Sequence, residues 1–180
     1  MPEQPKPKPY LSAAEIAAAP EVHIRHPLNP ASDVYLRALG RAAGLQRTAL
    51  TLARVPPGRE SFIYHSHERD EEFLFILSGC GRAEIDGETI EVGPGDFMGF
   101  PTPSVAHHLS NPYEVDLIYL MGGEHSSFDI GNFPRVGKRV IFDGERIQML
   151  EEKDLKPMSF EQWLPEGLPA AYRNPGSKKE

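Results

Sequence analysis

Residues 65–77 read HSHERDEEFLFIL, two histidines and a run of charged residues followed by an apolar segment. The segment from Phe73 to Leu77 is short and continuously apolar, which is typical of a β-strand buried on both faces. In an extended strand, residues i and i+2 face the same side, so His65 and His67 can point toward one position. Glu72 opens the apolar segment, where a carboxylate without a partner would be costly. This stretch therefore predicts a β-sheet protein with a site built from imidazole and carboxylate groups.

Glycine and proline turns divide the surrounding region into short segments with strand-like composition. Asp86-Gly87 is a strong signal for a two-residue hairpin turn. Pro56-Pro57-Gly58 and Gly93-Pro94-Gly95 are further turn signals. Between the turns we expect strands over residues 48–55, 61–67, 72–77, 82–85, 89–92, 97–100, 105–109 and 115–121. Strands of this length and spacing predict an all-β fold, either a sandwich or a small antiparallel β-barrel.

The region before this core, residues 1–46, is expected to be an arm that wraps the barrel. Residues 1–10 are rich in proline and lysine and are typical of an extended segment. Ser12 and Glu15 have the spacing of a capping box, which predicts a short helix over residues 12–19. Residues 26–46 are expected to form a connection with one helical turn at 33–39.

The core is expected to span residues 47–123, and residues 124–180 form a C-terminal extension. Within the extension we expect a loop over residues 124–138. A hairpin near residues 139–149 is predicted from the Asp143-Gly144 turn. The tail from Lys156 onward contains several prolines and is predicted to be irregular.

Composition limits the classes of protein that this chain can belong to. Its 180 residues are enough for one domain with a sizeable core. No run of 18 apolar residues is present, and the first residues lack the apolar segment of a signal peptide. Cys80 is the single cysteine, so no internal disulfide can form. We therefore expect a cytoplasmic protein that does not bind a membrane.

The net charge of −7 arises mainly from acidic residues between Glu68 and Asp96, where only Arg69 and Arg82 offset them. No cluster of basic residues forms a stripe elsewhere in the chain. Nucleic acid is therefore not an expected partner.

A second pair of histidines, His107-His108, follows His65 and His67 by about forty residues. Imidazole and carboxylate ligands together suit a first-row transition metal. Adjacent residues of a strand point to opposite faces, so only one of His107 and His108 can join His65, His67 and Glu72. The periodicity of the strand by itself leaves open which of the two histidines it is.

The spacing of these residues resembles the two sequence motifs of the cupin superfamily. Gly58, His65, His67, Glu72 and Gly79 fall in register with the first motif, in which a glycine precedes His-x-His and a glutamate precedes a second glycine. The second motif is matched by the residues Gly95, Pro101, His107 and Asn111. The chain departs from that motif at Pro103, which replaces a glycine, and by one extra residue before His107. With its flanks it is similar to single-domain bacterial cupins of uncharacterised function.

This resemblance implies a jelly-roll-like antiparallel barrel, a double-stranded β-helix, with a metal inside. It implies the ligands His65, His67, Glu72 and His107, the last favoured by its spacing to Asn111. One divalent transition metal per chain is expected, and Fe, Mn, Ni, Co, Zn and Cu all suit three nitrogens and one oxygen. A homodimer is also implied, since this is the usual state of similar cupins.

Four polar residues are candidates for contact with a substrate: Arg54, Tyr64, His108 and Tyr119. Arg54 interrupts an otherwise apolar strand and could bind a carboxylate or phosphate, or could equally be a charge on an edge strand. The nearby aromatic residues are more readily explained as core than as pocket wall.

The functional prediction is a metal-dependent enzyme acting on a small oxygen-rich metabolite. Similar cupins include isomerases or epimerases of sugars and sugar phosphates, dioxygenases and lyases. The alternative is a non-catalytic cupin that binds a sugar or an organic acid, because one fold serves many functions.

Overall fold

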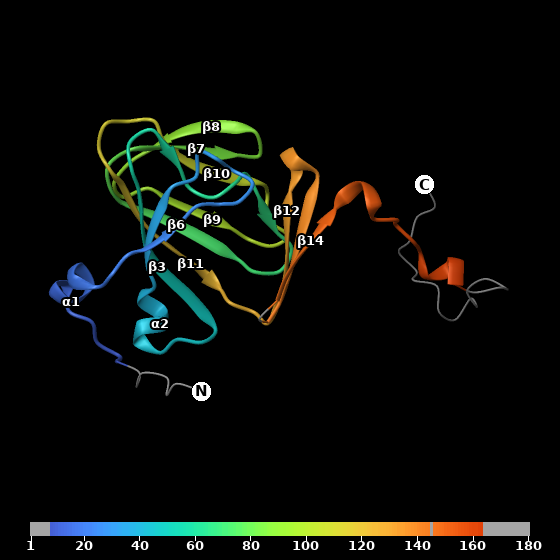
Figure 1. Cartoon of the computed structure of the whole chain (residues 1–180), viewed down its shortest axis with the longest axis horizontal. Coiled ribbons are helices and arrows are strands. Elements are labelled where there is room, and N and C mark those ends of the chain that lie inside the picture. The colour runs from blue at the N-terminus through green and yellow to red at the C-terminus, as the bar shows by residue number, and fades with distance from the viewer. Residues whose placement is uncertain (1–7, 145, 164–180) are drawn as a thin grey trace.

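The computed structural model describes residues 8–144 and 146–163, and the chain folds around three antiparallel β-sheets (Figure 1). The strands are β1 Val22–Ile24, β2 Val34–Arg37, β3 Thr48–Val55, β4 Arg59–Glu60, β5 Ser66–His67, β6 Glu72–Ser78, β7 Gly81–Ile85, β8 Glu88–Val92, β9 Phe97–Phe100, β10 His107–Asn111, β11 Leu117–Glu124, β12 Phe128–Phe133, β13 Lys138–Asp143 and β14 Arg146–Glu151. The helices are α1 Ala13–Ala18, α2 Leu39–Ala43 and the 3-10 turns η1 Pro134–Val136, η2 Glu152–Asp154 and η3 Phe160–Trp163. The predicted all-β class is confirmed.

Two of the sheets enclose the main core. One sheet has the strand order β1-β2-β3-β11-β6-β9 and the other the order β4-β10-β7-β8. Their inward-facing residues form one apolar cluster, which joins Ala53, Ile76 and Tyr119 of the first sheet to Ala83 and Leu109 of the second. The two sheets therefore form the small antiparallel barrel that the sequence predicts (Figure 1).

The tight turns of the barrel depend on residues that tolerate positive φ. Asp86 and Gly87, between β7 and β8, have φ values of 51° and 81°, as a two-residue hairpin turn of this type requires. Gly79 has a φ of 74°, and a Cβ atom there would lie 2.2 Å from the carbonyl oxygen of Asp116. Only glycine fits at Gly79, because both the backbone angle and the close approach exclude a side chain.

The third sheet has the order β14-β13-β12-β5 and stands beside the barrel (Figure 1). It has a small core of its own, in which Ile63, Phe133 and Val140 are buried. The hairpin predicted near residues 139–149 corresponds to β13 and β14. The expectation of a loop over residues 124–138 is wrong, because β12 pairs with both β13 and β5. The sequence does not predict this strand because Gly131 and Asn132 have low strand propensity.

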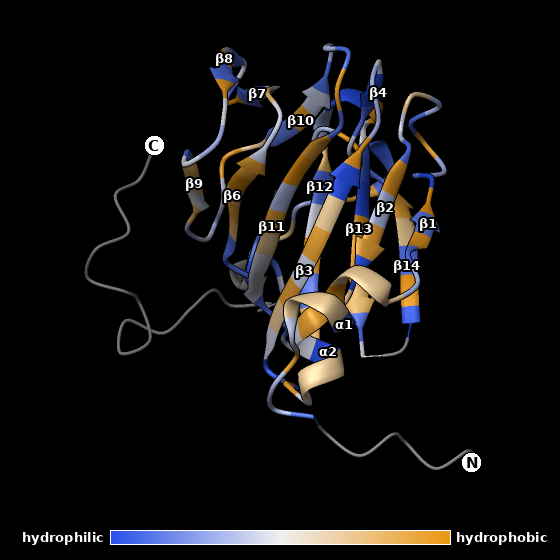
Figure 2. Cartoon of the chain, turned by 90° about the vertical axis from the view of Figure 1, so that its left-hand side faces the viewer, coloured by the Kyte–Doolittle hydropathy of each residue, from blue (hydrophilic) through white to orange (hydrophobic). Residues whose placement is uncertain are grey.

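The N-terminal region contributes two strands and two short helices. The side chains and backbones of Ser12 and Glu15 form the reciprocal hydrogen bonds of a capping box at the start of α1, which confirms the predicted N-terminal helix. The helical turn expected at residues 33–39 is wrong, since β2 occupies most of that range and α2 begins at Leu39. Figure 2 shows α1 and α2 on the outer face of the six-stranded sheet, over β3, with β6 and β9 left uncovered by helix.

In the part of the chain that the structure describes, no helix is long and apolar enough to cross a membrane. The predictions for the first residues of the arm and for the end of the tail concern residues 1–7 and 164–180, which lie outside the described residues.

Candidate metal centre

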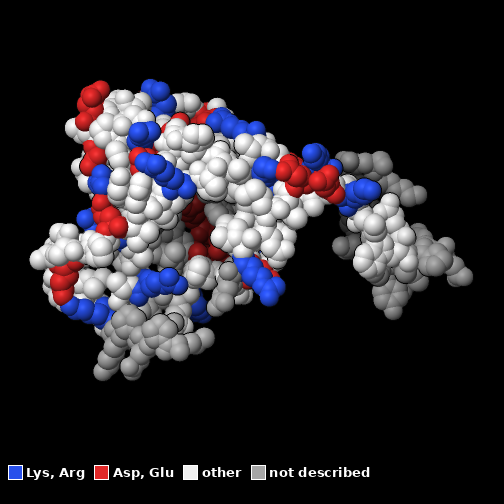
Figure 3. Space-filling view, in the orientation of Figure 1, with Lys and Arg blue, Asp and Glu red and all other residues white. Residues whose placement is uncertain are grey.

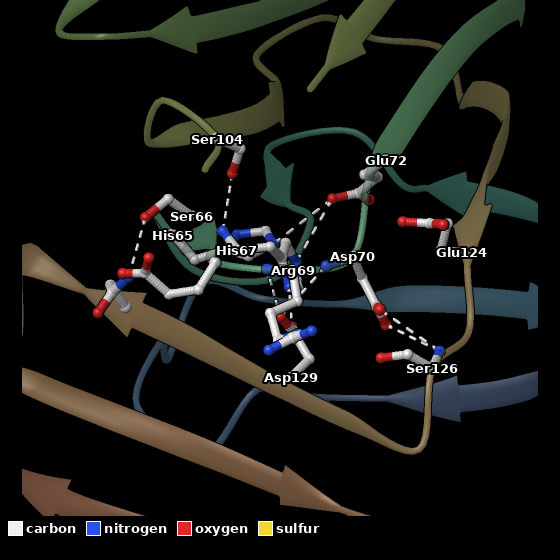
Figure 4. A network of polar contacts seen from close by, with 12 residues as sticks. His65, Ser66, His67, Arg69, Asp70, Glu72, Ser104, Glu124, Ser126 and Asp129 are labelled. Carbon is white, nitrogen blue, oxygen red and sulfur yellow. Dashed lines mark hydrogen bonds and ion pairs between the residues drawn. The ribbon is translucent and has the colours of Figure 1, made fainter. Parts of the chain in front are cut away.

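Four side chains from separate parts of the barrel converge on one point. The Oε2 atom of Glu72 lies 3.1 Å from Nε2 of His107, 3.6 Å from Nε2 of His67 and 3.8 Å from Nε2 of His65. Glu72 begins β6, His67 ends β5 and His107 begins β10, while His65 forms an isolated bridge with His107. Figure 4 shows His65, His67 and Glu72 pointing toward one another. The ligand atoms of these three residues lie within 4.8 Å of one another, close enough to hold one metal ion.

Each of the three imidazole rings is held through its Nδ1 atom by an acceptor. The acceptors are the Ile63 carbonyl for His65 at 2.7 Å, the Val105 carbonyl for His107 at 3.0 Å, and Oδ2 of Asp129 for His67 at 2.6 Å. A carbonyl oxygen can only accept, and so can the carboxylate of Asp129, whose pKa the hydrogen bond with His67 helps to lower despite its burial, so Nδ1 carries the proton in all three rings. A neutral imidazole protonated at Nδ1 has its lone pair on Nε2, the atom that faces Glu72. This is the arrangement that metal-ligating histidines require.

The electrostatics of the group also favour a bound cation. Burial lowers the pKa of His65 to about 4, so this ring is neutral at pH 7. Burial raises the pKa of Glu72, but the surrounding imidazoles lower it by more, so the pKa is below its ordinary value and Glu72 is a carboxylate. Within the described residues, no lysine or arginine forms an ion pair with Glu72. Three imidazole Nε2 atoms and a carboxylate oxygen therefore converge with no lysine or arginine of the described residues paired to them.

These observations test whether the residues fit the metal that the fold family implies. The donor set is three imidazole nitrogens and one carboxylate oxygen, which suits a divalent first-row metal. The tautomers are already those of ligands, and a cation at the centre would remove the repulsion between the four acceptors. The residues fit, and His65, His67, Glu72 and His107 would hold the ion.

Two aromatic side chains border the centre inside the barrel. The ring of Phe100 stacks on His107 with a centroid separation of 3.6 Å. Tyr119 is 1% exposed, and burial together with the charge of Glu72 raises the pKa of its hydroxyl. Tyr119 therefore remains protonated beside the centre. Of the four predicted substrate-contacting residues, Tyr119 is the one whose pKa the charge of Glu72 shifts.

The structure does not bring Arg54 to the metal centre, which corrects one expectation. Ala53 and Val55, its neighbours on β3, point into the core, so Arg54 lies on the outer face. Its guanidinium donates to Glu21 at 2.7 Å and contacts Asp116 at 3.4 Å. The hydrogen bond to Glu21 raises the pKa of Arg54. The alternative, a charge on an edge strand, is also wrong in its position, because β3 lies between β2 and β11 inside the sheet and Arg54 is on its outer face.

Tyr64 and His108 lie together on the other side of β10 from His107. Nε2 of His108 is 3.4 Å from Oε2 of Glu60, and His108 faces Glu84 across the strand pair β10–β7. Arg135 forms an ion pair with Glu84, and its guanidinium lies 4.2 Å from the ring centroid of Tyr64. We call Glu60, Tyr64, Glu84, His108 and Arg135 the lateral cluster. The structure therefore brings His107, and not His108, to Glu72.

Sequence reasoning missed Asp129, which is 3% exposed and bonded to His67. It lies in the segment that was expected to be a loop, and no motif marks it. Ser104 was missed as well; its hydroxyl accepts a hydrogen bond of 2.7 Å from the backbone nitrogen of His67. Each lies far in sequence from His67, the histidine that it contacts, so only the tertiary structure reveals these contacts.

A cavity of about 440 Å³ shares Glu72 with the metal group. Its lining is aromatic and acidic, and consists of Thr48, Glu71, Glu72, Phe73, Phe97, Gly99, Phe100, Pro101, Gly123 and Glu124. Phe73 and Gly99 are paired on the outer face of the sheet, whereas Glu72 and Phe100 face inward, so the cavity reaches both sides of this sheet end. Figure 3 shows acidic atoms recessed in a hollow of the molecular surface.

The fold and the site define a small antiparallel β-barrel protein with a mostly buried group of three histidines and one glutamate. Residues 51–122 match the family described as Cupin domain. The chain is 31% identical to a candidate sugar phosphate isomerase from Acidithiobacillus ferrooxidans, with a TM-score of 0.81 over 83% of this chain and 96% of that one. The protein belongs to the cupin superfamily, as a chain with a single cupin domain.

More distant solved structures share the fold. A sugar phosphate isomerase of the cupin superfamily from Silicibacter pomeroyi is 22% identical, with a TM-score of 0.72 over 84% of this chain and 98% of that one. A predicted oxalate decarboxylase from Thermotoga maritima is 20% identical, with a TM-score of 0.53 over 62% of this chain and 96% of that one. A comparison with curated protein sequences finds no match.

Proposed function

We propose that this protein is a metal-dependent enzyme that isomerises a small sugar or sugar phosphate. The observation that carries the proposal is the convergence of three Nε2 atoms on Glu72 without any lysine or arginine paired to that carboxylate in the described part of the chain. A buried cluster of this kind is costly unless a cation occupies it. His65, His67, Glu72 and His107 would hold one divalent ion of Fe, Mn, Ni, Co, Zn or Cu.

On a five- or six-coordinate metal, four protein ligands leave one or two positions for substrate, which distinguishes a working site from a purely structural one. A metal bound there supplies Lewis acidity toward a carbonyl or hydroxyl oxygen. Substrates with two adjacent oxygens, such as hydroxyaldehydes and hydroxyketones, suit such a site. The buried hydroxyl of Tyr119 is close enough to this centre for the charge of Glu72 to act on it.

The choice of isomerase over the dioxygenase or lyase chemistry of other cupins is supported by the relative of 31% identity, which is named as a candidate sugar phosphate isomerase. The predicted oxalate decarboxylase shares the fold at 20% identity and does not bear on the reaction.

The first experiment measures the metal content of protein purified without chelators, by elemental mass spectrometry, for wild type and for His65→Ala. We expect close to one ion per chain in wild type and loss in the variant. Each loaded form is then incubated with aldose and ketose substrates, with and without phosphate, and interconversion is followed by NMR. Absence of metal after reconstitution would contradict the proposal, and a ligand bound but recovered unchanged would support the binding alternative.

We infer that the protein is a homodimer, and the uncovered face of β6 and β9 supports this (Figure 2). On that face Phe75 is 36%, Leu77 42% and Phe97 65% exposed, an apolar surface that a partner chain would cover. Light scattering at micromolar concentration tests the inference. We expect a dimer mass for wild type and a monomer for Phe97→Glu, and a monomeric wild type would contradict it.

A further inference from the structure

The loop between the ligand candidates His67 and Glu72 is held by a distant part of the chain. Residues 68–71 form this loop, and segment 124–130 runs beside it (Figure 4). Every backbone N–H of the loop donates to that segment: Glu68 to the Ile130 carbonyl at 3.0 Å, Arg69 to Oδ1 of Asp129 at 3.0 Å, Asp70 to the same atom at 3.3 Å, and Glu71 to Oε2 of Glu124 at 3.3 Å. The segment thus fixes the path between two ligands.

Asp129 uses both of its carboxylate oxygens in this arrangement. Oδ2 accepts the Nδ1 proton of His67 at 2.6 Å, while Oδ1 accepts the two backbone N–H groups of Arg69 and Asp70. The residue is 3% exposed, so these three donors replace water. One buried carboxylate therefore controls the ring orientation of His67 and the loop that leads to Glu72.

We propose that Asp129 is a positioning residue of the metal centre, which selects the tautomer of His67 that leaves Nε2 free to bind a metal. The inference rests on the proposed metal-dependent function. It extends the site to β12, outside the residues 51–122 that match the cupin domain. His65 and His107 have backbone carbonyls in the equivalent role, so His67 is the one ligand candidate among the three that depends on a side chain.

Asparagine at this position cannot accept all of the hydrogen bonds that the carboxylate of Asp129 accepts from His67 and from the loop. If the amide oxygen of Asp129→Asn keeps the bonds to Arg69 and Asp70, the NH₂ group faces His67. It then donates to Nδ1, which moves the imidazole proton to Nε2 and blocks metal binding there. If the amide turns round, its NH₂ meets two backbone donors instead. Neither orientation satisfies all three donors that the aspartate accepts.

The experiment compares Asp129→Asn with wild type and with a matched control, Asp70→Asn. Asp70 lies in the same loop, and its carboxylate accepts a bond from the backbone nitrogen of Ser126 without contacting a histidine. Affinity for Co²⁺ and Zn²⁺ is measured by competition with a chromophoric chelator. Loss of a hydrogen-bond partner of a metal-ligating histidine typically weakens metal binding by about 10- to 100-fold. We expect that loss for Asp129→Asn and a change of less than about threefold for the control.

A second measurement determines the tautomer of His67 and needs neither bound metal nor an activity assay. Long-range proton–nitrogen NMR spectra of the metal-free protein at pH 7.5 report which ring nitrogen of His67 carries the proton. We expect Nδ1–H in wild type and Nε2–H in Asp129→Asn. An Nε2–H tautomer in wild type would overturn the proposal even if the variant fails to fold. So would wild-type metal affinity in a folded Asp129→Asn. If wild type binds no metal but its His67 is the Nδ1–H tautomer, the proposed function fails while the assignment of Asp129 is supported.

Discussion

His107 and His108 are neighbours in the chain, yet they belong to two clusters with different chemistry. His107 is 3% exposed and faces Glu72 inside the barrel, among two further imidazoles. His108 lies on the opposite face of β10, in the lateral cluster with Glu60, Glu84 and Arg135. The alternation of a β-strand places one ring in each cluster.

The two clusters differ in whether they contain a cation of their own. In the lateral cluster, Arg135 opposes Glu84, so positive and negative charges are both present in the protein itself. In the metal centre, the imidazole Nε2 atoms face a carboxylate, and each imidazole Nδ1 already donates a hydrogen bond elsewhere. A cluster that contains a cation of its own has less need of a bound ion than a cluster without one.

Alanine substitution of each neighbour tests this contrast most directly, with the largest expected effect. His107→Ala removes a ligand, and we expect its affinity for Zn²⁺ to fall by more than about 100-fold, since one of four ligands is lost. His108→Ala should retain wild-type affinity within about threefold. Chelator competition measures both. Equal losses in the two variants would erase the distinction between the clusters.

Removal of metal should destabilise the folded protein only where the ligands of the metal centre are intact. A ligand at 100 times its Kd stabilises the folded state by about 2.7 kcal/mol, and about 2–4 °C per kcal/mol is typical for a domain of this size. We therefore expect chelation to lower the Tm by about 5–10 °C, and metal to restore it. Scanning calorimetry of wild type, His107→Ala and His108→Ala gives the answer. The shift should vanish in His107→Ala and persist in His108→Ala.

A smaller effect concerns the pH dependence of the metal-free protein. Burial lowers the pKa of His108, and Arg135 and His107 add to this, whereas Glu60 and Glu84 oppose it. Because the folded-state pKa lies below the ordinary value of about 6.5, the unfolded chain binds the proton first, and stability is lost as pH falls below that value. One such group contributes at most about 1.4 kcal/mol per pH unit.

Replacing His108 by glutamine should therefore reduce the slope of stability against pH between 7.5 and 5.5. Part of the slope should remain, because the pKa of His65 is lowered to about 4 and acts in the same direction. Urea unfolding of the metal-free wild type and His108→Gln at several pH values measures the difference. Parallel curves would mean that His108 does not contribute.

The smallest effect is expected at the exposed rim of the lateral cluster. Arg135→Ala removes the ion pair with Glu84 and the contact with the ring of Tyr64. Because the Arg135 side chain is 56% exposed, we expect a loss of about 0.5–1 kcal/mol. Metal affinity should not change. Denaturant unfolding and chelator competition check these two values, and a tenfold loss of metal affinity would show that the clusters are coupled.

Much of the barrel and most of its centre could be predicted from the sequence, because they depend on local rules. The apolar run that begins at Phe73 and the Asp86-Gly87 turn specify strands and a hairpin whatever surrounds them. The i, i+2 spacing of His65 and His67 allows both rings to face one side. Glu72 could be singled out because a carboxylate at the start of an apolar strand needs a partner.

Tertiary structure alone decided which groups meet across the chain. The sequence contains Asp129, but its role exists only because β12 pairs with β5, more than sixty residues earlier. Arg54 looked like a pocket residue until its strand was oriented with Ala53 and Val55 inward. Periodicity along a strand establishes that two faces alternate, but which face meets the core, and which strand lies alongside, depends on the packing of the whole barrel.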